Sequence, residues 1–70
     1  MMGATETNFT LDNICPRIWY GQKIKIQQEG KSDFVIENYL LQDRKYDDVR
    51  NRWIRSMGVD LDGALTVFII

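Results

Sequence analysis

The sequence predicts a small α+β domain, with a mostly antiparallel sheet of three or four strands made from two β-hairpins and one short helix or helical turn. Apolar and polar residues alternate along several runs, which is the period of a half-buried strand. A polar turn containing glycine separates the runs in each half of the chain. Helical spacing of apolar residues is short and is interrupted by Pro16. The alternative architecture is a small closed β-barrel, because five short strands could close one.

The chain of 70 residues is long enough for one domain, which we place at residues 9–70. Residues 1–8 lack apolar periodicity, and we interpret them as a flexible N-terminal tail. Thr10 is suited to cap a short helix. The helix face would carry apolar residues at helical spacing, namely Leu11, Ile14, Cys15 and Ile18. Because Pro16 lacks an N–H and pushes Cys15 toward extended geometry, we expect the helix to end near Ile14.

The first hairpin is expected over residues 18–38. From Gln22 the period becomes two, with Ile24 and Ile26 on one face and lysines between them. A polar turn at residues 29–32 offers Gly30 for a positive φ. The second run places Phe34 and Ile36 on one side and Val35 and Glu37 on the other.

The middle of the chain, residues 39–51, is expected to be a loop with one helical turn. Asp47 and Asp48 suit the first turn of a helix, and Arg50 suits its end, since these charges complement the helix dipole. The inner side of this segment would carry its larger apolar residues, which are Leu40, Leu41, Tyr46 and Val49.

The second hairpin is expected over residues 52–70. Its first strand shows uneven apolar spacing, which indicates a β-bulge near Ser56 or Gly58. The turn at residues 60–63 ends in Asp-Gly, which tolerates the left-handed geometry of tight hairpins. The final strand, residues 64–70, is apolar on both faces, so we expect it to be central in the sheet or covered.

The chemical groups in this chain do not favour an enzyme. There is no histidine, and Cys15 is the only thiol, so the commonest general base and zinc ligand are missing. Asp60 and Asp62 fit a turn better than a calcium loop, because the other ligands of such a loop are absent. We therefore expect no catalytic residues, no metal site and no cofactor. No apolar run approaches membrane-spanning length, and we expect a bacterial or viral protein of the reducing cytoplasm that does not enter a membrane.

A binding role fits the composition better, because several large aromatic residues must share a small core. Exposed aromatic residues beside arginine are typical anchors of protein interfaces. The candidate interaction surface consists of Trp53, Arg55, Arg52, Tyr46, Trp19 and Tyr20. The partner would be another protein or a second copy of this chain. The alternative is a small nucleic-acid-binding protein that uses Tyr46, Arg52, Trp53 and Arg55, with bases stacked on the two aromatic rings. The net charge of −1 gives no general attraction to nucleic acid.

One stretch and the pattern around it carry a resemblance. The segment Asn51-Arg52-Trp53-Ile54-Arg55-Ser56-Met57 is followed by an Asp-Gly turn and a closing Leu-Thr-Val-Phe-Ile-Ile. This layout, from Leu11 to Ile70, resembles small uncharacterised proteins of phages and conjugative elements from Gram-positive gut bacteria. The chain departs from that pattern at Cys15-Pro16 and at Trp53. Such proteins usually have no assigned activity, so the resemblance implies an origin in a mobile element more than a mechanism. Together with the missing catalytic groups, it leads us to expect a non-enzymatic accessory protein of such an element.

Overall fold

The computed structural model describes residues 9–70, and the predicted tail, residues 1–8, lies outside the described residues. Two hairpins alternate with two helical segments along the chain. In chain order the elements are α1 (Leu11–Ile14), the 3₁₀ helix η1 (Cys15–Arg17), β1 (Lys23–Gln28), β2 (Lys31–Glu37), the 3₁₀ helices η2 (Asn38–Gln42) and η3 (Arg44–Tyr46), α2 (Asp47–Arg50), β3 (Ile54–Val59) and β4 (Leu65–Ile69). The predicted α+β class is confirmed.

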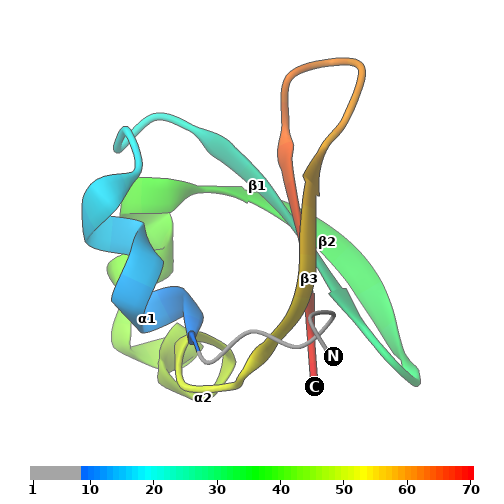
Figure 1. The fold of residues 1–70 in the computed structure, drawn as a ribbon. Helices are drawn as coiled ribbons and strands as arrows, with labels where there is room; N and C mark the ends of the chain where they lie inside the picture. Colours follow the sequence, from blue (N-terminus) through cyan, green and yellow to red (C-terminus); the bar gives the residue numbers. More distant parts are fainter. Residues whose placement is uncertain (1–8) are drawn as a thin grey trace.

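The four strands form one mixed sheet in the order β2-β1-β4-β3. Each predicted hairpin is present, because β1 pairs antiparallel with β2 and β3 pairs antiparallel with β4. In the centre of the sheet, β1 and β4 run parallel. The outer strands β2 and β3 do not meet, so the sheet is open and the alternative of a closed barrel is wrong (Figure 1). The doubly apolar strand β4 is central, as predicted.

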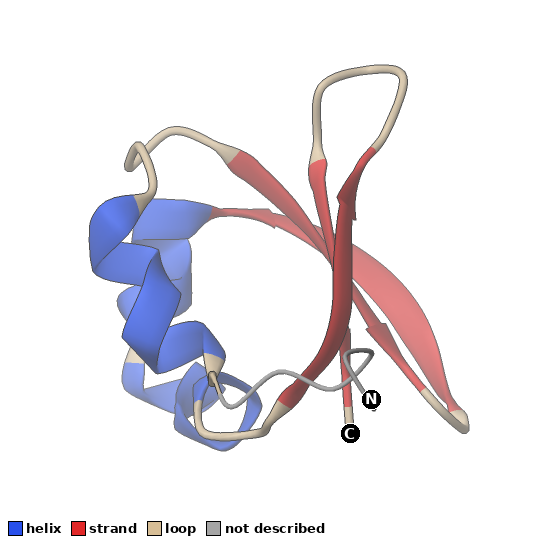
Figure 2. Cartoon of the chain, in the orientation of Figure 1, coloured by secondary structure: helices blue, strands red, loops and turns tan. Residues whose placement is uncertain are grey.

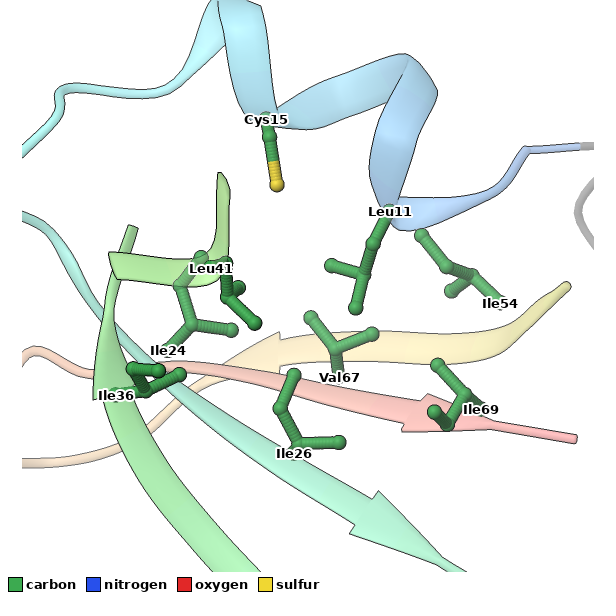
Figure 3. Close-up of a cluster of buried hydrophobic side chains, with 9 residues drawn as sticks. All are labelled: Leu11, Cys15, Ile24, Ile26, Ile36, Leu41, Ile54, Val67 and Ile69. Carbon is green, nitrogen blue, oxygen red and sulfur yellow. The ribbon is translucent and has the colours of Figure 1, made fainter. Parts of the chain in front are cut away.

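The helical segments all lie on one side of the sheet, and no helix or strand formed by residues 9–70 covers the opposite face, which we call the open face (Figure 2). The core lies between the two layers. It contains aliphatic side chains from every strand, together with residues from α1, η1 and η2 (Figure 3). Its members are Leu11, Cys15, Ile24, Ile26, Ile36, Leu41, Ile54, Val67 and Ile69.

The alternation of side chains along each strand decides which of them enter this core. Ile24 and Ile26 are fully buried, while Lys25 between them lies on the open face. In β3 the register shifts between Ile54 and Ser56, so Arg55 is the extra residue of a β-bulge. The sequence pattern had predicted this bulge near Ser56 or Gly58, which lie further along the strand.

The N-terminal helix begins and ends as predicted. Thr10 and Asn13 form a reciprocal capping box, and α1 ends at Ile14. Cys15, however, is helical rather than extended, because a 3₁₀ turn follows directly and Pro16 occupies its first turn. A proline in a first turn lacks an N–H that would be unpaired in any case, so it does not disturb the turn.

The middle segment contains more helix than predicted. Two 3₁₀ turns precede α2, which starts with Asp47 and Asp48 and ends with Arg50, in agreement with the predicted charge pattern. Leu41 is buried in the core, whereas Leu40 is 44% exposed. Of these two adjacent leucines, therefore, Leu41 packs in the core and Leu40 stays at the surface.

Candidate interaction surfaces

The six residues predicted to form an interaction surface lie in three separate places. Trp19 and Tyr20 lie together in the connection between η1 and β1, with ring centroids 5.5 Å apart. Tyr46 is half-buried and stacks on Phe34, with centroids 6.1 Å apart. The three remaining residues, Arg52, Trp53 and Arg55, lie at the start of β3 or just before it.

Tyr39 joins Trp19 and Tyr20 in an exposed cluster that we call the aromatic corner. The ring of Tyr39 meets that of Tyr20 edge-on at 6.3 Å between centroids. Trp19 and Tyr20 are each 67% exposed, and Tyr39 is 49% exposed. The sequence pattern did not place Tyr39 in the site, because its contact with Tyr20 depends on how the end of β2 packs against the segment before β1.

Buried polar contacts hold the aromatic corner in place. The side chain of Asn38 is 3% exposed, and its Nδ2 lies 3.0 Å from the carbonyl oxygens of Cys15 and Ile18 and 3.3 Å from that of Trp19. The backbone N–H of Tyr39 also donates to the carbonyl of Tyr20 at 2.8 Å. These bonds tie the loop that carries Trp19 to the end of β2.

The Trp19 ring lies close over Gly21. A Cβ atom added at Gly21 would lie 2.6 Å from the Trp19 ring, closer than any normal contact. The indole therefore packs directly over the glycine backbone. Hydrogen bonds hold the backbone that carries the three rings of the aromatic corner, so this backbone loses little conformational freedom when a partner binds.

Two shallow grooves lie on either side of Tyr39. One is lined by residues of η1, of η2 and of the connection between η1 and β1, namely Cys15, Pro16, Ile18, Tyr20, Asn38, Tyr39 and Gln42. The other is lined by Ile36, Tyr39, Leu40, Asp43, Lys45 and Tyr46. Both combine apolar walls with a few polar groups, which is the usual character of a site that receives an apolar side chain of a partner.

The arginines of the predicted surface are partly engaged within the chain. Arg52 pairs with Asp48 at 3.1 Å. Its neighbour Arg50, with a side chain 13% exposed, pairs with Asp12 at 2.9 Å and with Asp47, so it links α1 to α2. These contacts hold the helical layer together.

Arg55 lies on the open face of the sheet. Its guanidinium lies 5.7 Å from the centre of the Phe68 ring, a cation–π contact. Trp53 precedes the inward-facing Ile54, so strand alternation puts it on the same side as Arg55. We call Trp53, Arg55 and Phe68 the sheet-face site; Phe68 was not among the predicted residues.

The only cysteine is part of the core. Cys15 is 3% exposed. Burial raises the pKa of its thiol above the ordinary value, and the nearby Arg50 guanidinium offsets this only in part. A buried, protonated thiol is a poor nucleophile, so Cys15 acts as a small apolar core residue, the role that the sequence favours.

Within residues 9–70 no three His, Cys, Asp or Glu side chains are grouped so that they could hold a metal ion. The same part of the chain has no helix with the length and apolarity needed to cross a membrane. No protein-family model, curated protein or solved structure matches this sequence. The functional argument therefore depends on the surfaces of the molecule itself.

Proposed function

We propose that this chain is a non-enzymatic protein-binding module that recognises its partner through the aromatic corner. The observation that carries the proposal is the exposure of Trp19, Tyr20 and Tyr39 on a backbone that hydrogen bonds hold in place. Trp and Tyr are enriched among the residues that dominate binding energy at interfaces. Rings carried by a backbone that is already held in place bind at lower entropic cost than rings on a flexible loop.

The grooves beside Tyr39 support a partner that inserts apolar side chains. A partner segment crossing the corner would place one such side chain on each side of the Tyr39 ring, against Ile18 and Pro16 in one groove and against Ile36 in the other. The resemblance to proteins of phages and conjugative elements supports a cytoplasmic accessory protein of a mobile element as the setting for this activity.

Affinity capture from a native lysate tests the proposal with three proteins. We expect the unmodified chain to retain a partner and the Trp19→Ser variant to lose it. Trp53→Ser is the matched control, because Trp53 is 53% exposed but lies outside the corner. Removing a central aromatic anchor typically costs 2 kcal/mol or more, so we expect binding to the purified partner to weaken about 30-fold in titration calorimetry.

Circular dichroism would confirm that both variants keep the fold, since both side chains are largely exposed. Equal binding by the unmodified chain and by Trp19→Ser would contradict a role for the aromatic corner. Loss of binding only in Trp53→Ser would instead assign partner binding to the sheet-face site.

A second candidate function is the binding of single-stranded nucleic acid on the open sheet face. The contact of Arg55 with Phe68 favours it, because stacked aromatic and cationic groups hold bases. The sequence pI of about 5.2 counts against it. Trp53 fluorescence in a Trp19→Phe variant, titrated with oligonucleotides, would decide: quenching that weakens as salt increases would support this function, and unchanged fluorescence would exclude it.

A further inference from the structure

The two edges of the sheet differ sharply in their protection against pairing with another strand. The outer strand β2 carries Lys31, Asp33 and Glu37, and charges on an edge strand oppose the docking of a further strand. The outer strand β3 reads Ile-Arg-Ser-Met-Gly-Val, so after Arg55 it contains neither a charge nor a proline. Its exposed apolar residues include Met57 at 51% and Val59 at 74%.

The backbone of β3 is oriented to accept a new strand. The N–H of Asp60 donates to the carbonyl of Ala64 at 2.8 Å, so residues 56, 58 and 60 bond toward β4. In an antiparallel ladder the alternate residues, Met57 and Val59, then direct their N–H and C=O groups away from the sheet. Within residues 9–70, the only strand that neighbours β3 is β4.

The charges at the two ends of β3 point to a second copy of the same strand. Arg55 stands at the beginning of the strand, and Asp60 follows its last residue. When two copies pair antiparallel, the positive end of each lies beside the negative end of the other. A partner strand without opposite charges at its two ends would lack this match.

Two-fold symmetry restricts the register. A two-fold axis normal to the sheet keeps each side chain on its own face, so opposite residues must both have odd or both have even numbers. With Gly58 opposite its own copy, Met57 faces Val59 of the second copy, and Ser56 faces its Asp60. The N–H of Ile54 already donates to the carbonyl of Phe9 at 2.8 Å, so pairing can begin only after that residue.

We propose that two copies of this chain associate through antiparallel pairing of their β3 strands, forming one continuous eight-stranded sheet. Each copy closes the exposed edge of the other, and Met57 and Val59 of both copies form an apolar strip across the junction. This interface is separate from the aromatic corner, so the dimer would present two copies of the corner to its partners.

Sedimentation equilibrium tests the proposal, with an expected mass twice the 8.2 kDa of the single chain. Val59→Lys places a charge within the proposed junction, and we expect dimerisation to weaken at least tenfold. Val35→Lys is the matched control, because Val35 is a similarly exposed valine, at 57%, on the other edge strand. We expect this variant to remain a dimer.

Two further measurements separate pairing of backbones from general apolar contact. Met57→Pro removes an outward N–H that is not used inside the sheet, so we expect a folded monomer. Amide hydrogen exchange at Met57 and Val59 should be slow in concentrated solution and fast after dilution.

A mass of 8.2 kDa at every concentration tested would overturn the proposal. Equal weakening by Val35→Lys and Val59→Lys would also overturn it, as would slow exchange at Met57 and Val59 that dilution does not change. The Trp19→Ser variant should dimerise normally. A failure of the dimer proposal would therefore appear in sedimentation, and a failure of the proposed function would appear in partner binding.

Discussion

At the scale of single residues, Asn38 is the side chain on which the arrangement of the aromatic corner depends. It is buried, and its Nδ2 serves three carbonyl oxygens of the segment between α1 and β1, whereas its Oδ1 has no hydrogen-bond partner among residues 9–70. If the Asn38 amide were removed, these carbonyl oxygens would lose this donor. An unsatisfied buried acceptor costs more stability than an average hydrogen bond contributes.

We therefore predict that Asn38→Ala lowers the free energy of unfolding by about 2–3 kcal/mol, measured by urea denaturation. Asn51→Ala is the matched control, because the Nδ2 of Asn51 donates to the carbonyl of Asp47 at 2.9 Å but lies at the surface. We expect that control to lose less than about 1 kcal/mol. Similar losses in the two variants would show that Asn38 does not anchor the loop.

The sequence indicated some site residues but not their support. The exposure of Trp19 and Tyr20 could be predicted, because a core of this size cannot enclose every large ring of the chain. The roles of Asn38 and Tyr39 could not, since their contacts with residues 15–20 cross about twenty positions of the chain. Nothing in the local pattern around Asn38 distinguishes it from an exposed turn asparagine.

At the scale of elements, strands and turns were more predictable than the helical layer. The period of two located β1 and β2, because alternation of apolar and polar residues reports directly on a half-buried sheet. The Asp-Gly turn between two apolar runs located β3 and β4. The parallel pairing of β1 with β4 was not predicted, since hairpin patterns specify only neighbours along the chain. The 3₁₀ turns η2 and η3 escaped prediction because such short turns have no distinct apolar period.

The two glycine turns give a prediction at this scale. Gly30 and Gly63 have φ values of +77° and +90°, a region that costs other residues about 1–2 kcal/mol. We expect Gly63→Ala to lower the free energy of unfolding by about 1 kcal/mol, although its added Cβ would meet no atom within 4 Å. The loss would therefore come from the backbone alone.

Gly58→Ala is the control for this measurement. Gly58 also has open space for a Cβ, but its φ is not positive. We expect no loss of stability in thermal or urea unfolding of this variant, since replacing glycine reduces the entropy of the unfolded chain. Equal destabilisation by the two substitutions would mean that the turn geometry at Gly63 is not what the hairpin requires.

At the scale of the whole molecule, the order of strands makes the two hairpins interdependent. β1 and β4 pair along five positions, from Ile24 with Leu65 to Gln28 with Ile69. The core residue Leu41 and the first helix pack over strands of both hairpins (Figure 3). Neither hairpin has a separate core, and an isolated two-stranded hairpin is at best marginally stable in water.

We therefore predict that the two halves of the sheet unfold in a single transition. The two tryptophans allow a direct test, because Trp19 lies beside the first hairpin and Trp53 at the start of the second. In Trp53→Phe and Trp19→Phe variants, the remaining tryptophan reports on one half at a time. For each variant, the midpoint of urea unfolding by fluorescence should equal that by far-ultraviolet circular dichroism.

The parallel β1–β4 ladder is the physical reason for this expectation, since separating the hairpins would expose its hydrogen bonds together with buried Ile24, Ile26 and Val67. Both variants should be compared at one low protein concentration, so that association through β3 does not stabilise either of them differently. A fluorescence midpoint for Trp53 clearly below the circular dichroism midpoint of the same variant would show that β3 and β4 detach first, and that the central parallel pairing contributes little to the stability of the sheet.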